Sequence, residues 1–125
     1  MTIKSFRELL VWQRSMTLAE QVYTLTEDFP SSERYGLTAQ PRRASVSIPS
    51  NIAEGHMLQT GHYLHHLTVA AGSNAELQTQ LELGYRLRLT SQSRVMPILD
   101  EAAEIGRMLR GLHAAVARAK RRTNP

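Results

Sequence analysis

The stretch "VMPILDEAAEIGRMLRGLHAAVARA", residues 95–119, carries the clearest pattern in the chain. Its apolar residues recur at alternating steps of three and four, at Val95, Ile98, Ala102, Ile105, Leu109, Leu112, Val116 and Ala119. This spacing gathers them on one face of an α-helix, so it predicts a long amphipathic helix over about residues 94–120. Pro97 fits the first turn of such a helix, where its missing amide costs little.

Upstream of this stretch, the same kind of periodicity indicates three more helices, over about residues 6–29, 33–54 and 60–89. No alternating strand pattern and no internal repeat interrupts them. A chain of 125 residues is long enough for one domain with its own core. Long helices joined by short connections predict an all-α fold, an antiparallel up-and-down four-helix bundle spanning residues 1–125 with a basic tail at 118–125.

The first predicted helix is apolar on two sides. One stripe runs through Trp12, Met16 and Tyr23, and a second contains other aliphatic residues. Such a helix needs two partners. One stripe can face the core of a bundle, and the other needs either a further helix of the same chain or a neighbouring subunit. The candidate residues for a subunit interface are Val11, Leu18, Val22, Leu25, Pro49, Asn51 and Asn74.

The second predicted helix contains Pro41 and Pro49, each of which removes an amide donor. A kink is therefore expected, and the small residue Ser47 leaves room for a neighbour to approach. Gly55 is expected to close this helix in a left-handed conformation.

Two polar features of the predicted helices have more than one interpretation. Asn74 interrupts the seam of the third helix, where it either fixes register or oligomeric state, or faces solvent or a neighbouring group. Arg43 and Glu76 are predicted to form a salt bridge between the second and third helices or between subunits, and this is favoured over phosphate binding.

The sequence lacks the usual signatures of catalysis and of cofactor binding. It has no cysteine, no Gly-x-Ser-x-Gly elbow, no Walker-type loop and no Glu-x-x-His pair. His62, His65 and His66 have the helical spacing of metal ligands, but no carboxylate lies in the same turn, so a polar face or a subunit contact is favoured over a metal site. We therefore expect no enzyme activity, no cofactor and no bound metal.

Basic residues outnumber acidic ones, 15 to 11, which gives a formal net charge of +4. The clustered basic residues either complement helix dipoles or hold phosphate backbones by charge. The candidates for nucleic-acid contact are Arg42, Arg43, Arg86, Arg88, Arg118, Lys120, Arg121 and Arg122. No apolar run is long enough to span a membrane and the first residues lack a signal core, so a soluble, cytoplasmic protein without a membrane partner is expected.

Four segments together resemble the four-helix-bundle family of intervening-sequence or S23-like proteins. They are "FRELLVWQRSMTLAEQVYTLTEDFP", "YGLTAQPRRASVSIPSNIAEG", "GSNAELQTQLELGYRL" and "EIGRMLRGL". The most specific piece is the Arg-Arg pair followed by Ser-Ile-Pro-Ser-Asn-Ile-Ala-Glu-Gly. Pro41, before that pair, and Asn74 depart from the family pattern.

The resemblance implies a homopentameric, barrel-like ring of bundles with no catalytic residue. Members of the family occur in intervening sequences of bacterial 23S ribosomal RNA genes. A related branch, the accessory variability proteins of diversity-generating retroelements, binds a reverse transcriptase and its RNA. The expected function is thus that of a non-catalytic homo-oligomeric scaffold for structured RNA, for DNA or for an RNA–protein complex such as that reverse transcriptase. The alternative is a protein interaction module with no nucleic-acid role.

Overall fold

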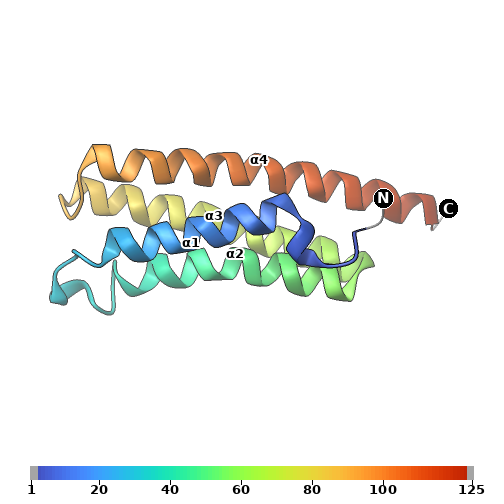
Figure 1. The fold of residues 1–125 in the computed structure, drawn as a ribbon, viewed down its shortest axis with the longest axis horizontal. Coiled ribbons are helices and arrows are strands. Elements are labelled where there is room, and N and C mark those ends of the chain that lie inside the picture. The colour runs from blue at the N-terminus through green and yellow to red at the C-terminus, as the bar shows by residue number, and fades with distance from the viewer. Residues whose placement is uncertain (1–2, 124–125) are drawn as a thin grey trace.

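The computed structural model describes residues 3–123, and within that range it contains helices and no strand. The long helices are α1 (Leu10–Thr26), α2 (Ala39–Leu58), α3 (Thr60–Arg86) and α4 (Gln92–Thr123), and the short 3-10 helices are η1 (Phe6–Glu8) and η2 (Ser31–Glu33). The predicted all-helical class with four long helices is confirmed. Figure 1 shows the four helices lying alongside one another. The α1–α2 and α3–α4 connections lie at one end and the α2–α3 turn lies at the other.

The first helix is shorter than predicted because the chain bends at Leu9, whose backbone is extended (φ −74°, ψ 124°). Before that bend, Ser5 and Glu8 form a capping box around η1. The expected helix over 6–29 is therefore a short 3-10 turn followed by α1, which ends at Thr26.

The second helix begins and ends later than predicted. Residues 34–38 form turns, so α2 begins at Ala39 and Pro41 falls in its first turn, where the missing amide has no helical partner to lose. Gly55 lies inside α2 instead of closing it. The helix ends at Leu58, and Gln59, in a left-handed backbone conformation (φ 63°), leads directly into α3.

The last two helices also differ from the expected bounds by a few residues. α3 ends at Arg86, three residues early, and Arg88 adopts a positive φ of 63° in the connection. α4 begins at Gln92, so Pro97 lies beyond the first turn and not within it. None of the described helices is both long and apolar enough to cross a bilayer.

The core lies along the line where the four helices meet. In α4 it receives Val95, Ile98, Ala102, Ile105 and Leu109, as the periodicity predicts. The later seam residues Leu112 and Val116 are only partly buried. Figure 1 shows the reason, since the end of α4 extends beyond the other helices.

The structure corrects the assignment of the two stripes of α1. The four aliphatic residues proposed for a subunit interface, Val11, Leu18, Val22 and Leu25, are at most 5% exposed and belong to the core of the single chain. The stripe left at the surface is the other one, in which Met16 and Tyr23 are each 44% exposed.

The remaining interface candidates also lie mainly inside the chain. Pro49 is buried, Asn74 is 2% exposed, and Asn51 is half-buried between α2 and α3. Asn74 donates from Nδ2 to the backbone carbonyl oxygen of Ala102, so its partner is a neighbouring helix of the same chain. The amides of Asn51 and Asn74 are thus paired within the chain, whereas Pro49 lines a groove between α1 and α2.

Candidate nucleic-acid interface

The fold separates the basic candidate residues into two groups at opposite ends of the molecule. Arg42 and Arg43 lie in the early turns of α2, near the α3–α4 connection with Arg86 and Arg88. The remaining candidates lie in the last turns of α4, at the other end in Figure 1. These are Arg118, Lys120, Arg121 and Arg122. Residues 124–125 of the expected basic tail lie outside the described residues.

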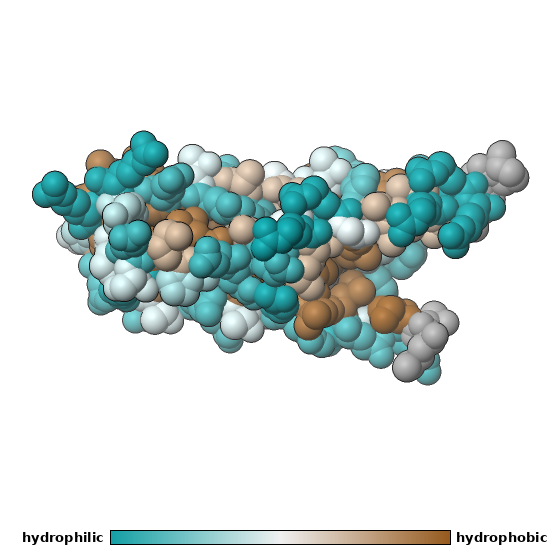
Figure 2. Space-filling model, turned by 90° about the horizontal axis from the view of Figure 1, so that it is seen from above, coloured by the Kyte–Doolittle hydropathy of each residue, from teal (hydrophilic) through white to brown (hydrophobic). Residues whose placement is uncertain are grey.

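The end of α4 is strongly basic because no Asp or Glu follows Glu104 in the sequence. Arg118, Arg121 and Arg122 are exposed, and none of them forms an ion pair with another described residue. Lys120 lies over the start of α3, with its Nζ 3.2 Å from the position a Cβ would take at Gly61. Figure 2 shows this end of α4 as a hydrophilic projection, separated by a gap from the N-terminal segment.

The acidic residues of α4 lie in its first half and are partly neutralised by arginines. Glu101 accepts a forked contact from Arg14 of α1, in which Nε of Arg14 lies 2.9 Å from Oε2. This hydrogen bond raises the pKa of the Arg14 guanidinium above its ordinary value. Glu104 accepts from Arg107 on the next turn. Acidic and basic side chains are therefore paired in the first half of α4, whereas the basic side chains of its last turns have no acidic residue beside them on that helix.

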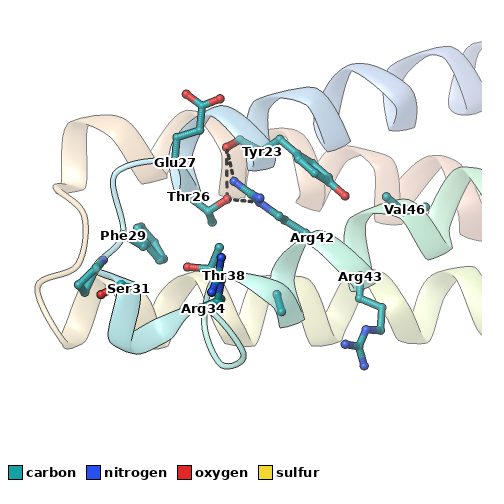
Figure 3. A pocket seen from close by; sticks show the side chains of 12 residues that line it. Tyr23, Thr26, Glu27, Phe29, Ser31, Arg34, Thr38, Arg42, Arg43 and Val46 are labelled. Atoms are coloured by element: carbon teal, nitrogen blue, oxygen red, sulfur yellow. Dashed lines mark hydrogen bonds between the residues drawn. The ribbon is translucent and has the colours of Figure 1, made fainter.

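Arg42 holds α1 and α2 together. Its Nε donates to Oγ1 of the buried Thr26 at 2.8 Å and an Nη donates to the carbonyl oxygen of Tyr23 at 3.2 Å. The guanidinium also lies 4.5 Å from the centre of the Tyr23 ring. Figure 3 shows Arg42 reaching from α2 to α1 in this way. Two of the nitrogen donors of Arg42 therefore stabilise the packing of α1 against α2.

The expected salt bridge between Arg43 and Glu76 is absent. Both side chains are exposed, and no ion pair joins them within residues 3–123. Arg86 instead approaches Glu82 at 3.9 Å on its own helix. Arg43 is left free at the edge of a hollow.

That hollow, which we call the arginine hollow, has a volume of about 700 Å³ and lies where the α1–α2 connection meets the start of α2. Its lining includes Arg34, Arg42 and Arg43 together with the rings of Tyr23 and Phe29. Figure 3 shows these side chains coming from α1, from the connection and from α2. Sequence reasoning missed Arg34, since it lies in a turn outside any charge cluster.

The histidine cluster does not form a recognisable metal centre. His62 and His65 are exposed, whereas His66 is half-buried and its Nδ1 lies 2.9 Å from Oδ1 of Asn51 on α2. Across residues 3–123, no three His, Cys, Asp or Glu side chains are grouped so that they could hold a metal ion. The ring of His66 instead joins α3 to α2.

A chain of small polar side chains continues from this histidine along the α2–α3 interface. Asn51 donates from Nδ2 to the backbone oxygen of Ser47 at 2.8 Å, and the Ser47 hydroxyl lies 2.8 Å from that of Ser73. These contacts explain why α2 carries serine and asparagine where a core helix normally carries aliphatic residues. Ser47 and Asn51 are four residues apart, which places both side chains on one face of a helix, and this spacing is the feature of the sequence that could have predicted their contact.

Comparisons with known proteins agree with this architecture. The family model described as 23S rRNA-intervening sequence protein matches residues 7–111. The crystal structure of a protein with unknown function from the S23 ribosomal protein family of Bacteroides thetaiotaomicron superposes with a TM-score of 0.75 at 23% identity, covering 83% of this chain and 98% of that chain. At that identity the likeness shows the fold alone. No curated protein matches the chain. The basic residues at 118–122 lie beyond the matched range.

Proposed function

The chain belongs to the 23S rRNA-intervening sequence protein family, and we propose that it is a non-catalytic, homo-oligomeric helical scaffold that binds structured RNA through the basic end of α4. The RNA contacts in this proposal are the exposed residues Arg118, Arg121 and Arg122, with Lys120 beside them. The up-and-down, antiparallel order of the helices and a cytoplasmic location are part of the same proposal.

One observation carries the proposal. After Glu104 the chain contains six Lys and Arg residues and no carboxylate side chain, and four of the six lie in the projecting last turns of α4. Cations at a helix C-terminus complement its dipole, but a single turn suffices for that effect. A longer uncompensated run on a projecting helix suits the closely spaced phosphates of a folded RNA.

Self-association is supported by the apolar surface between α1 and α2. A groove of about 420 Å³ lies there, lined by residues that include Trp12, Met16, Val46 and Pro49. Val46 is 42% exposed and Met16 is 44% exposed, so the groove leaves apolar surface in contact with water. Closing this face against another copy in a pentameric ring buries that surface. Five copies at +4 each carry about +20, which strengthens attraction to a polyanion.

The RNA–protein partner that the sequence resemblance suggests is a reverse transcriptase of a diversity-generating retroelement. In that setting the ring presents several basic α4 ends to one RNA. Each contact is weak, and the affinity comes from their number.

The test is RNA binding by two variants that each lose three positive charges. One is the triple variant Arg118→Ala, Arg121→Ala and Arg122→Ala, and the control removes Arg86, Arg88 and Arg110, which are also exposed. A structured RNA hairpin is titrated at two salt concentrations by mobility shift. We expect the first variant to bind at least about tenfold more weakly and with a flatter salt dependence, because it makes fewer phosphate contacts. The control is expected to change binding by less than about twofold.

Two results would overturn the proposal. Equal losses in both variants would show a response to total charge alone, and no binding at low salt by the wild-type oligomer would leave the protein interaction module as the better reading. Light scattering tests the assembly separately. A single particle of 14.1 kDa at micromolar concentration would contradict the ring.

A further inference from the structure

We infer that the arginine hollow is a binding site for a nucleoside phosphate, with the phosphate on the guanidinium groups and the base against the aromatic lining. The site lies at the opposite end of the molecule from the projecting end of α4. It therefore does not depend on the proposed RNA contact at Arg118, Arg121 and Arg122.

Arg42 is preorganised by its contacts with α1. Its hydrogen bonds to Thr26 and Tyr23 fix the guanidinium plane and occupy Nε and one Nη. The other Nη makes no hydrogen bond with a described residue, and Arg42 is part of the lining of the hollow. A fixed, planar donor whose position does not have to be organised on binding suits a phosphate oxygen.

Two further arginines line the hollow together with Arg42. Arg34 and Arg43 are exposed, line the same hollow, and make no ion pair with any residue between 3 and 123. Glu27 is the acidic residue of the lining, and Figure 3 shows its carboxylate directed away from Arg42. Three arginines thus line the hollow without a bound carboxylate, Arg43 at its rim with its guanidinium directed away from Arg42 (Figure 3), and an anion is the complementary ligand.

Aromatic and hydroxyl residues line the hollow beside these arginines. The lining also includes Phe29, the Tyr23 ring against which the Arg42 guanidinium lies, and the hydroxyl residues Ser31 and Thr38. Base stacking on aromatic rings is the usual way in which proteins hold an unpaired base. The volume of about 700 Å³ is within the range of small-molecule sites. Inorganic phosphate would use the arginines and leave the apolar lining uncovered.

The experiment is calorimetric titration of the full chain with adenosine 5′-monophosphate, adenosine, and inorganic phosphate. We expect the nucleotide to bind at least about tenfold more tightly than either half of it, because only the nucleotide engages both parts of the lining. A single-stranded oligoadenylate forms a fourth arm. Tighter binding of the oligoadenylate than of the mononucleotide identifies an unpaired RNA nucleotide as the source, and the reverse order identifies a free nucleotide.

Two double variants show where the ligand binds. Arg34→Ala with Arg43→Ala removes two exposed charges from the hollow, and Arg107→Ala with Arg110→Ala removes two exposed charges on α4, outside the hollow. We expect about a tenfold or greater loss of nucleotide affinity in the first and less than about a twofold loss in the second. Arg42→Lys retains the charge but loses the planar fork, and it is also expected to weaken binding, with circular dichroism confirming that it folds.

The inference fails if the nucleotide does not bind, if phosphate binds equally well, or if both double variants lose affinity to the same extent. The triple variant at Arg118, Arg121 and Arg122 retains the hollow and is expected to bind the nucleotide like wild type. Failure of this inference is thereby distinguished from failure of the RNA proposal.

Discussion

The side-chain amide of Asn74 on α3 donates a hydrogen bond of 2.9 Å to the backbone carbonyl oxygen of Ala102 on α4. This contact lies in the core, where Asn74 is 2% exposed and Ala102 is fully buried. The amide oxygen of Asn74 accepts from Gln78 one turn later, so both ends of the side chain are paired. A single position on α3 therefore selects a single position on α4, which specifies the register of the two helices.

Replacing Asn74 by alanine is expected to lower the free energy of unfolding by about 2 kcal/mol, because the variant loses the contact to Ala102 and leaves a cavity. Urea denaturation followed by circular dichroism at fixed protein concentration measures this. Thr79→Ala on the exposed side of α3 is the control and is expected to change stability by less than about 0.5 kcal/mol. Equal midpoints for the two variants would refute the role given to Asn74.

Gly55 is expected to tolerate no side chain. A Cβ there would lie 2.9 Å from Cβ of His66 and 3.0 Å from Cδ1 of Tyr63, so Gly55→Ala forces α2 and α3 apart and destabilises the fold by about 1–3 kcal/mol. Gly72 and Gly111 are matched controls, since a Cβ at either meets nothing within 4 Å. Alanine at those helical sites is expected to stabilise by up to about 1 kcal/mol. Destabilisation by all three substitutions in urea would contradict the close approach at Gly55.

The forked contact between Arg14 and Glu101 is expected to stabilise the α1–α4 interface. Lysine at position 14 retains the charge but cannot make the fork, so Arg14→Lys should lower the melting temperature, measured by thermal circular dichroism. Arg107→Ala breaks an exposed contact with Glu104 inside α4 and should leave the melting temperature nearly unchanged. If Arg107→Ala proved the more damaging of the two, the importance assigned to the fork would be wrong.

We expect the stability of the fold to fall at alkaline pH because of the ionisation of Tyr63. It is 5% exposed, and its burial raises the pKa of the phenol because the phenolate is poorly solvated. The pKa of Tyr63 in the folded protein thus lies above the unfolded value of about 10. The stability that the buried neutral phenol contributes is therefore complete below about pH 10 and is lost as pH rises through the folded pKa. Tyr63→Phe should show a smaller decline in stability over that range, as measured by denaturation at a series of pH values.

Tyr35→Phe is the control for this measurement. Tyr35 is 82% exposed, so its substitution should leave the alkaline decline of the wild type in place. Identical pH profiles for Tyr63→Phe and wild type would show that another group causes the decline.

The sequence was sufficient for the helical class and for the core face of α4. Val95, Ile98, Ala102, Ile105 and Leu109 are buried as their spacing predicts, because helical periodicity is a local property that needs only one apolar face. The family could also be recognised from its motifs, and the match over residues 7–111 confirms it.

The same reasoning could not choose between the two stripes of α1. Val22 and Tyr23 both belong to apolar stripes of the helix, yet Val22 is fully buried and Tyr23 is 44% exposed. The difference arises only when α2 and α4 occupy their places beside α1. Nor could spacing assign Arg42 to Thr26, since the two residues lie sixteen positions apart and meet only because α2 packs against α1.

The chain by itself therefore determined which segments form helices, which residues can be buried, and which residues carry charge, because these depend on composition and on a repeat of 3.6 residues. Tertiary structure decided which apolar stripe of α1 meets the core. It also decided that Gly55 lies inside α2, where α3 approaches closely, and does not end the helix. Finally, it divided the arginines between the arginine hollow and the end of α4. Each of these outcomes depends on the relative placement of two helices. That placement is a property of packing between distant segments, which no local pattern encodes.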